Sequence, residues 1–349
     1  MSNSGKTKRK EEKKMEELSK IDVSLGPLHE MWIMPVRSKV MMTGIGLKIF
    51  NLLTEPKTSD ALAKDIDSHA GNTRIFLDTL AGMALLVKEN GKYQNAPISE
   101  QYLVEGSPTY LGEFFAGRDR WFTPVLENLE GIVKNGPSAV GIDDAFRGSA
   151  DEWAKSARTS AQYMRSGYAQ QVADIVSRLP EFPSMEKMID LGGGAGLNGI
   201  AIVAKHPSMK GAIFDQPPVA KVADGFIREY GLEERMETKA GDYLKDPIGE
   251  GYDLIFMSST INFALPMIDD FLKKIYDALN PGGVFINFSE GMTDEGTKPV
   301  EMLLGHLSML MSGMDFRLHQ GFIAEAMIRA GFKSVRSCRC YTILSPSNC

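Results

Sequence analysis

The sequence predicts a mainly helical N-terminal domain followed by an α/β domain with a mostly parallel, doubly wound sheet. Two observations lead to this prediction. From residue 186 onward, short apolar runs alternate with amphipathic stretches, which is typical of the strand–helix units of a parallel sheet. Residues 40–95, in contrast, show helical spacing that ends in a hairpin signal. A chain of 349 residues is long enough to form both domains.

The composition is that of a globular protein, because 43% of the residues are hydrophobic and 24% are charged. The net charge of −6 disfavours a dedicated nucleic-acid binder. No run of 18 apolar residues is present, and no apolar segment follows the charged stretch 6–14, so we expect neither a membrane span nor a signal peptide. The sequence therefore predicts a cytoplasmic protein that binds neither membrane nor nucleic acid.

Residues 1–20 form a tail in which basic residues are mixed with glutamates. Charge blocks of this kind are typically solvated, so we expect a frayed tail or a short helix. A nucleic-acid-binding arm is the alternative, and the interleaved glutamates disfavour it. We place the N-terminal domain at residues 21–115, and we assign residues 116–349 to a helical connector and the α/β domain.

Three helices are predicted in the N-terminal domain from apolar residues that recur at helical spacing. The first covers residues 40–53. The second begins within residues 57–66, where Ser59 is the expected N-cap. The third covers residues 72–86. Together they are expected to enclose a small apolar core.

A hairpin should follow these helices, because residues 85–97 alternate in polarity around Asn90-Gly91. Three helices and a two-stranded wing predict a winged-helix module. Such modules often bind DNA. Here, however, the third helix carries Asp78 as well as Arg74, and a carboxylate on that helix would be repelled by the DNA phosphates. We therefore expect the module to contact another protein.

The α/β domain is predicted to contain six strands with amphipathic helices between them. The predicted strands are residues 187–191, 210–215, 235–242, 252–259, 283–290 and 334–344. Two of the three cysteines, Cys338 and Cys340, alternate along the last of these strands and are expected to be buried there. We predict neither a disulfide framework nor a metal site.

A glycine-rich turn follows the first of these strands, in the sequence "MIDLGGGAGLNG". Gly194, Gly196 and Gly199 formally meet the G-x-G-x-x-G fingerprint of dinucleotide-binding proteins, and Asp215 closes the next strand. Glycines at such a turn accept positive φ and let a ligand approach the backbone closely. An acid at the end of the second strand can accept hydrogen bonds from both ribose hydroxyls. The pattern therefore suits any adenosine-containing ligand.

The neighbouring acids narrow the choice of ligand. Asp190 directly precedes the glycines, where a carboxylate would repel a pyrophosphate and attract a cation. Asp242 ends another predicted strand, where it can accept a hydrogen bond from an adenine amino group. A ligand with an adenine, a ribose and a positive charge but no phosphate is S-adenosylmethionine.

With these residues in view, the chain resembles class I S-adenosylmethionine-dependent methyltransferases. More narrowly, it resembles the small-molecule O-methyltransferases that carry an N-terminal winged-helix dimerisation domain. The resemblance runs from about residue 30 to the C-terminus and implies a Rossmann-like catalytic domain and a homodimer. The segments that match in order are "GLKIFNLL", "YQNAPISEQYLVEGSPTYLGEFF", "IDLGGGAG", "FDQPPV", "AGDYLKDP" and "AEAMIRAGF".

The resemblance also implies which residues hold the cofactor and its product S-adenosylhomocysteine. They are Met164, Asp190, Gly192, Gly194, Gly196, Asp215, Gln216, Gly241, Asp242, Tyr243, Met257 and Ser258. In this scheme Asp215 binds the ribose hydroxyls, and Asp242 and Tyr243 flank the adenine. Met164 is explained equally well by packing in a helix core.

The chain departs from the family at the catalytic base. The family usually has a histidine soon after the fourth strand, and that position is Asn262 here. A general base contributes about 10²–10⁴-fold to the rate, mainly for poorly acidic hydroxyls. Asparagine cannot take a proton, although it can orient an acceptor that is already deprotonated. His306 is the best candidate for a substitute base, and a partly buried helix histidine is the alternative.

The expected substrate is a small apolar or aromatic molecule. Met302, Met309, Met311 and Met314 crowd one predicted helix, and methionines both fill cores and adapt to flat ligands. The first hypothesis for the function is therefore a methyltransferase. Its product would be an O-methyl compound by family, with sulfur or carbon as other possible acceptor atoms because of Asn262.

Three alternatives remain open at the level of sequence. The chain could bind S-adenosylmethionine but catalyse a non-methylating reaction, such as a decarboxylation, hydroxylation or pericyclic step. It could be a ligand-sensing regulator that uses its wing to bind DNA. It could also be a nicotinamide-dependent oxidoreductase, the literal interpretation of the glycine fingerprint.

Overall fold

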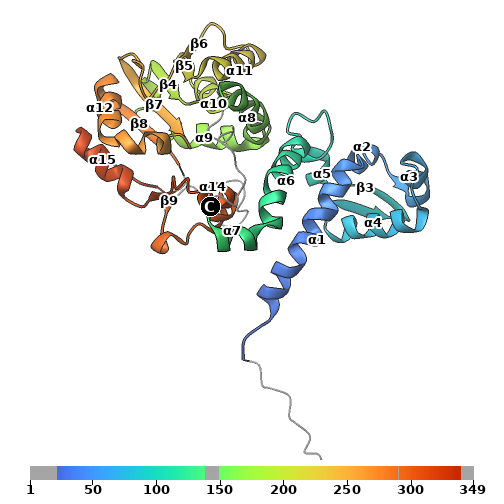
Figure 1. Cartoon of the computed structure of the whole chain (residues 1–349). Coiled ribbons are helices and arrows are strands. Elements are labelled where there is room, and N and C mark those ends of the chain that lie inside the picture. The colour runs from blue at the N-terminus through green and yellow to red at the C-terminus, as the bar shows by residue number, and fades with distance from the viewer. Residues whose placement is uncertain (1–21, 138–148, 290, 339–349) are drawn as a thin grey trace, which may run out of the picture.

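The computed structural model describes residues 22–137, 149–289 and 291–338. Figure 1 shows an α/β domain, a small helical domain built from the N-terminal part of the chain, and helices that run between them. The predicted charged tail, residues 1–20, lies outside the described residues. So do Cys340 and Cys349.

The N-terminal domain combines helices with a three-stranded antiparallel sheet in the order β1-β3-β2. The predicted hairpin is confirmed, since Glu89 pairs with Lys92 across a turn in which Asn90 and Gly91 both have positive φ. Strand β1 was not predicted. The elements are α1 (Gly26–Gly46), α2 (Ile49–Leu52), β1 (Lys57–Thr58), α3 (Ser59–Asp65), α4 (Ala70–Gly82), β2 (Leu86–Glu89), β3 (Lys92–Asn95) and α5 (Pro97–Tyr102).

The helix predicted over residues 40–53 is in fact two helices. Helix α1 ends at Gly46, and Lys48 has a left-handed φ of 55° that turns the chain into α2. The turn brings the ring of Phe50 against Gly44, where a Cβ would lie only 3.1 Å from the Phe50 ring. Apolar residues at helical spacing predicted one continuous helix, but the packing of the buried Phe50 favours a break between α1 and α2.

The predicted N-cap of the second helix is wrong by one residue. Thr58, and not Ser59, occupies the N-cap of α3, and its hydroxyl accepts a hydrogen bond of 3.3 Å from the N–H of Ala61. Thr58 also ends strand β1, so its backbone is extended, which is the conformation that an N-cap residue requires.

Helices connect the two domains (Figure 1). They are α6 (Gly112–Glu127), α7 (Leu129–Asn135), α8 (Ala150–Tyr163) and α9 (Ala169–Val176). A π-helical turn at Met164–Tyr168 separates α8 from α9, and Gly167 has a φ of 111° inside it. Such π-turns occur frequently at functional sites.

The α/β domain has a five-stranded, wholly parallel sheet in the order β6-β5-β4-β7-β8. Five of the six predicted strands are confirmed. The sixth is wrong over its described part, because residues 334–338 form no strand and Cys338 is exposed. The strands are β4 (Lys187–Leu191), β5 (Lys210–Asp215), β6 (Met236–Ala240), β7 (Tyr252–Ser258) and β8 (Leu279–Phe288).

Both faces of the sheet are covered, which confirms the doubly wound architecture. Met188 and Leu254 point into a core built with α8 to α11, and Ile189 and Ile255 point into a second core built with α12 and α15. The covering helices that follow the strands are α10 (Leu197–Lys205), α11 (Pro217–Glu229), α12 (Ile268–Ala278) and α15 (Phe322–Ala330).

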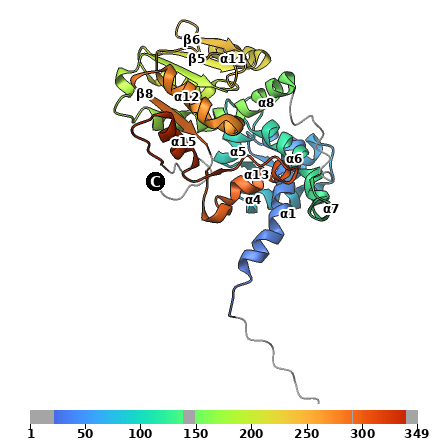
Figure 2. The ribbon, with the colours of Figure 1, turned by 60° about the vertical axis from the view of Figure 1, so that its left-hand side comes forward.

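The order of the strands reverses between β4 and β7, because the chain passes outward through β5 and β6 and then returns to the other side of β4. In open α/β sheets, ligands bind outside the carboxyl ends of the strands at such a switch point. The chain beyond β8 forms short elements near the same end of the domain (Figures 1 and 2). These elements are β9 (Gly291–Met292), α13 (Val300–Gly305), α14 (Leu307–Met311) and β10 (Leu318–His319).

Within the described ranges, no helix is long and apolar enough to cross a membrane. The same residues contain no cluster of three or more His, Cys, Asp or Glu side chains that could hold a metal ion.

Candidate active site

The glycine turn joins the end of β4 to the start of α10. Gly192, Gly194 and Gly196 all have positive φ, at 67°, 59° and 78°. A Cβ at Gly196 would lie 2.3 Å from Cδ1 of Ile213 on the neighbouring strand. The turn therefore needs glycine for its backbone conformation and also for its close approach to β5.

Asp190 lies beneath this turn and is 1% exposed. Its Oδ2 atom accepts a hydrogen bond of 3.2 Å from the N–H of Gly199, while Oδ1 has no hydrogen-bond partner. Burial raises the pKa of the Asp190 carboxyl to about 7. An acid in this state would be stabilised as a carboxylate by a nearby cation.

Asp215, at the end of β5, contacts the glycine turn directly. Its Oδ2 atom accepts a hydrogen bond of 2.9 Å from the N–H of Gly194, and Oδ1 accepts one of 2.7 Å from the N–H of Gln216. Burial raises the pKa of the Asp215 carboxyl, and the two backbone N–H groups oppose this rise. The structure thus brings the predicted ribose acid onto the predicted glycine turn.

The loop after β6 begins with Gly241, where a Cβ would lie 2.7 Å from the carboxylate of Asp246. The Asp242 carboxylate accepts a hydrogen bond from the N–H of Leu244 and forms a 2.9 Å ion pair with Lys245. The ammonium of Lys245 holds the pKa of Asp242 below its usual value. Asp242 is therefore an anionic hydrogen-bond acceptor at neutral pH.

Tyr243 links this loop to the loop after β7. Its hydroxyl donates a hydrogen bond of 3.4 Å to the carbonyl of Thr260, and burial raises the pKa of its phenol. The Thr260 hydroxyl in turn donates to the carbonyl of Leu191, and a Cβ at Gly192 would lie 2.9 Å from the Thr260 methyl group. Thr260 therefore connects three of the loops at this edge of the sheet, and its sequence context did not indicate this role.

The end of β7 places the remaining predicted cofactor residues beside β4. Met257 is fully buried in the core shared with α12, and Ser258 is partly exposed. Ser259 has a φ of 56°, an uncommon conformation for a residue with a side chain. The backbone turns sharply here and enters the short helix η5 (Ile261–Met267).

Asn262 lies in the first turn of η5 and is half-buried. The adjacent Phe263 is 49% exposed, and its ring meets that of Trp153 from α8 edge to face at 5.9 Å. Helix η5 therefore reaches across to the helical connector. The side chains of η5 itself include no titratable group.

His306 does not lie within a continuous helix as predicted. It separates α13 from α14 with a φ of −123°. Its Nδ1 atom lies 3.0 Å from the carbonyl of Met302, and its ring packs edge to face on Phe316. If Nδ1 donates to that carbonyl, Nε2 is left as the proton acceptor. These contacts attach His306 to the C-terminal segment and not to η5.

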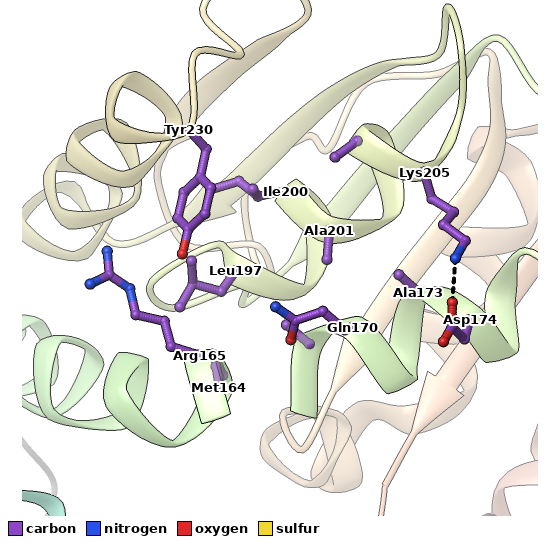
Figure 3. A pocket seen from close by; sticks show the side chains of 12 residues that line it. Met164, Arg165, Gln170, Ala173, Asp174, Leu197, Ile200, Ala201, Lys205 and Tyr230 are labelled. Atoms are coloured by element: carbon purple, nitrogen blue, oxygen red, sulfur yellow. Dashed lines mark hydrogen bonds and ion pairs between the residues drawn. The ribbon is translucent and has the colours of Figure 1, made fainter. Parts of the chain in front are cut away.

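Met164 lines a cavity of about 290 Å³ between α9 and α10 (Figure 3). Leu197, the first residue of α10, lies on the same wall. Arg165 points toward Tyr230 in Figure 3, and an ion pair between Lys205 and Asp174 closes the far end. Met164 also packs against the core, so its predicted contact with the cofactor stays a prediction.

A row of aromatic rings crosses from the connector to the end of β8. Phe114 of α6 stacks on Tyr163, Tyr163 contacts Tyr168, and Tyr168 meets Phe288 edge to face at 6.0 Å. All four side chains are half-buried. Sequence analysis missed this row because its members are far apart in the chain and come together only in the folded structure.

The fold is that of an α/β domain, and the glycine turn and the two acids Asp190 and Asp215 lie at the switch point of its sheet. Comparison with known families identifies the class. The family profile of the O-methyltransferase domain matches residues 131–333, which is more than half of the chain. The profile of the O-methyltransferase dimerisation domain matches residues 33–105.

Individual relatives agree with these matches. The chain is 32% identical over 259 residues to an uncharacterised protein of Methanocaldococcus jannaschii, covering 71% of this chain and 65% of that relative's length. It is 26% identical to the N,N-dimethyltransferase OxyT of Streptomyces rimosus, over 78% of this chain and 80% of the relative. It is 24% identical to the tetracenomycin polyketide synthesis 8-O-methyl transferase of Streptomyces glaucescens, over 86% and 89%.

Solved structures share the fold. Human N-acetylserotonin methyltransferase, solved in complex with S-adenosylmethionine, superposes with a TM-score of 0.72 at 23% identity, covering 91% of this chain and 94% of the other. An O-methyltransferase family protein from Burkholderia thailandensis gives a TM-score of 0.73 at 21% identity, covering 90% and 95%.

The chain therefore belongs to the O-methyltransferase family, and the predicted resemblance is confirmed. It is an S-adenosylmethionine-dependent methyltransferase. The non-methylating and oxidoreductase alternatives are not favoured, because the relatives described above whose names state an activity are methyltransferases.

Proposed function

We propose that the protein transfers a methyl group from S-adenosylmethionine to a small aromatic molecule, with the cofactor bound on the glycine turn. The observation that carries this proposal is the contact between Asp215 and the N–H of Gly194, because it holds an acid that could bind a ribose against a turn that a ligand can approach closely. When bound, the cofactor supplies an activated methyl group on a sulfonium.

The residues at the turn fit such a ligand. Asp190 offers an unpaired buried carboxylate oxygen near the place where a cationic ligand would lie. The glycine turn carries no side chain that would fill the space above Gly194, where a Cβ would meet nothing within 4 Å. Asp215 and Gln216 would hold the ribose, and Asp242 and Tyr243 would hold the adenine. Gly241 and Ser258 would line the floor of the same site, and the buried Met257 would support it from the core.

Asn262 is proposed to orient the methyl acceptor and not to remove its proton. A side-chain amide can donate and accept hydrogen bonds, but it cannot act as a base at neutral pH. The acceptor should therefore reach the site ionised or with a free lone pair, such as an acidic phenol, a thiol or an amine. His306 remains the candidate base for less acidic acceptors.

An aromatic acceptor is supported by the aromatic row at the edge of the site. Tyr168 and Phe288 are half-buried beside the end of β8, and rings in such positions offer flat surfaces for stacking. Methyl transfer is chiefly a matter of positioning, so a stacked acceptor would gain rate from being held in line.

The protein is proposed to form a homodimer through its N-terminal domain. The matched dimerisation profile supports this, as do the exposed apolar side chains of Leu28, Met31 and Trp32 on α1. Figures 1 and 2 show the first half of α1 projecting away from the rest of the molecule. The winged-helix assignment, the domain boundary at residue 115 and the cytoplasmic location stay predictions from the sequence.

Isothermal titration with S-adenosylhomocysteine tests the proposed cofactor site, with NADH as the control ligand. Micromolar binding of the first and none of the second is the expected result. Transfer of labelled methyl groups to a panel of phenols, thiols and amines then tests the acceptor. Failure of S-adenosylhomocysteine to bind would overturn the proposal.

A further inference from the structure

We propose that Lys274 is a positioning residue that holds the loop 242–246 in the conformation that receives the adenine. The inference rests on the proposed function, since it takes this loop as the adenine-binding loop. It adds a residue on α12 that lies some thirty positions away in sequence and is not among the residues implied by the family resemblance.

The geometry is a tripod of hydrogen bonds. The Lys274 ammonium donates to the carbonyl oxygens of Tyr243 at 2.7 Å, Leu244 at 3.1 Å and Asp246 at 3.1 Å. An ammonium has three N–H donors, so these three carbonyls use its full hydrogen-bonding capacity. The charged group is therefore bound to the backbone of a single loop.

The loop curls around this ammonium. The carboxylate of Asp246 accepts a hydrogen bond from the N–H of Asp242 at 2.8 Å, and the N–H of Asp246 donates to the carbonyl of Asp242 at 2.7 Å. These bonds close the loop on itself, and the carbonyls of Tyr243, Leu244 and Asp246 face Lys274. Hydrogen bonds to a charged donor are the stronger ones, so the ammonium is the main external support of this backbone.

Packing against Phe271 holds the Lys274 side chain in place. Lys274 is half-buried, and its ammonium lies 5.5 Å from the centre of the Phe271 ring on the same helix. The ring of Tyr243 contacts the same phenylalanine at 6.2 Å. Burial lowers the pKa of Lys274, and Asp242 and Asp246 oppose this change. Lys274 and Tyr243, the residue proposed to contact the adenine, therefore pack on the same phenylalanine.

The neighbouring Lys273 provides a matched control. It points to the surface and forms an ion pair with Asp277 within the same helix, at positions i and i+4. Substitution of either lysine by methionine removes one positive charge from α12 and retains an unbranched side chain that is only one heavy atom shorter. Only Lys274→Met leaves three loop carbonyls without their donor.

The experiment is titration of the full-length wild type, Lys273→Met, Lys274→Met and Lys274→Arg with S-adenosylhomocysteine. Lys274→Met should bind roughly ten-fold more weakly than Lys273→Met, because the apparent affinity falls with the fraction of loops in the competent conformation. Lys274→Arg should fall between them, because a planar guanidinium retains the charge but cannot form the same tripod.

Hydrogen exchange separates positioning from a general loss of structure. In Lys274→Met, the amides of residues 242–246 should exchange faster, while those of the turn 192–196 should be unchanged. Equal affinity of the two methionine variants would overturn the inference, as would an equal rise in exchange in both segments. If the wild type itself fails to bind, the proposed function fails, and this result is distinct because all four proteins would then give no signal.

Discussion

The carboxylate of Asp215 at the end of β5 accepts a hydrogen bond of 2.9 Å from the backbone N–H of Gly194, in the turn that follows β4. The contact joins two neighbouring strands of the parallel sheet at their carboxyl ends. It aligns an acid with the positive-φ turn that would lie under a ribose. This relationship makes Asp215 the first position to test.

Asp215→Ala should weaken S-adenosylhomocysteine binding by roughly 10- to 100-fold, because hydrogen bonds to a charged group contribute about 1.5–3 kcal/mol. Titration calorimetry measures this change. Asp224→Ala is the matched control, since Asp224 is an acid on α11 whose carboxylate pairs with Arg228 on the surface. Unchanged affinity in Asp215→Ala would exclude Asp215 from the cofactor site.

Substitution of Asn262 tests how the acceptor is handled. Asn262→Ala should lower the rate of methyl transfer about ten-fold, because an acceptor that is no longer oriented is seldom in line with the methyl group. Binding of S-adenosylhomocysteine should not change. Turnover equal to that of the wild type would remove Asn262 from the acceptor site.

Asn262→His asks whether a base at this position extends the range of acceptors. The variant should gain up to about 10²-fold on weakly acidic phenols, and the gain should appear as pH rises through the histidine pKa, near 6.5. Rates on thiols and acidic phenols should change little. Parallel pH profiles for variant and wild type would show that residue 262 does not face the acceptor.

Two alanine substitutions in the glycine turn should lower the free energy of unfolding by different amounts. Gly194→Ala meets no atom within 4 Å, so it should lose about 1–2 kcal/mol of stability from its positive φ alone. Gly196→Ala adds an overlap with Ile213 and should lose about 3 kcal/mol or more. Urea unfolding measures both, and equal losses would contradict the assigned packing.

Asp190 should give the free energy of unfolding a distinct pH dependence. Its folded pKa of about 7 lies above the unfolded value near 3.9, so the folded state binds more protons between these values. Stability should therefore fall as pH rises from about 4 to 7, by up to about 4 kcal/mol, and level off above 7. Asp190→Asn should lack this slope, and equal slopes in urea titrations of the two proteins would be the contrary result.

The exposed first half of α1 is expected to form part of the dimer interface. Trp32 is 72% exposed and Met31 is 69% exposed, although both are large apolar side chains. Met31→Asp with Trp32→Asp should raise the dimer dissociation constant roughly 100-fold or more, because each buried side chain of this size contributes about 1.5–3 kcal/mol. Sedimentation velocity measures this change, with Glu30→Ala as the control, and an intact dimer would place the interface elsewhere.

The sequence alone determined the parallel sheet and its glycine turn. Apolar runs such as residues 187–191 and 210–215 match their strands at both ends, because local patterning and burial on both faces agree there. Gly192 directly follows the first of these strands, and Asp215 is the last residue of the second. The sequence could therefore locate the strand ends and the candidate ligand-binding residues together. The hairpin at Asn90-Gly91 was equally predictable, because two positive-φ residues dictate its turn.

Only the tertiary structure decided which distant residues support the loops of the candidate cofactor site. Thr260 donates one hydrogen bond to the carbonyl of Leu191, and Lys274 donates three to carbonyls of the loop 242–246. Nothing in their sequence neighbourhood distinguishes either residue. Lys273 and Lys274 are adjacent and identical in type, yet one faces solvent and the other holds a loop. The described part of the predicted sixth strand, residues 334–338, forms no strand for the same reason, since a strand needs a partner as well as an alternating pattern. Local patterning sets the elements, while long-range contacts select the residues that position the chemistry.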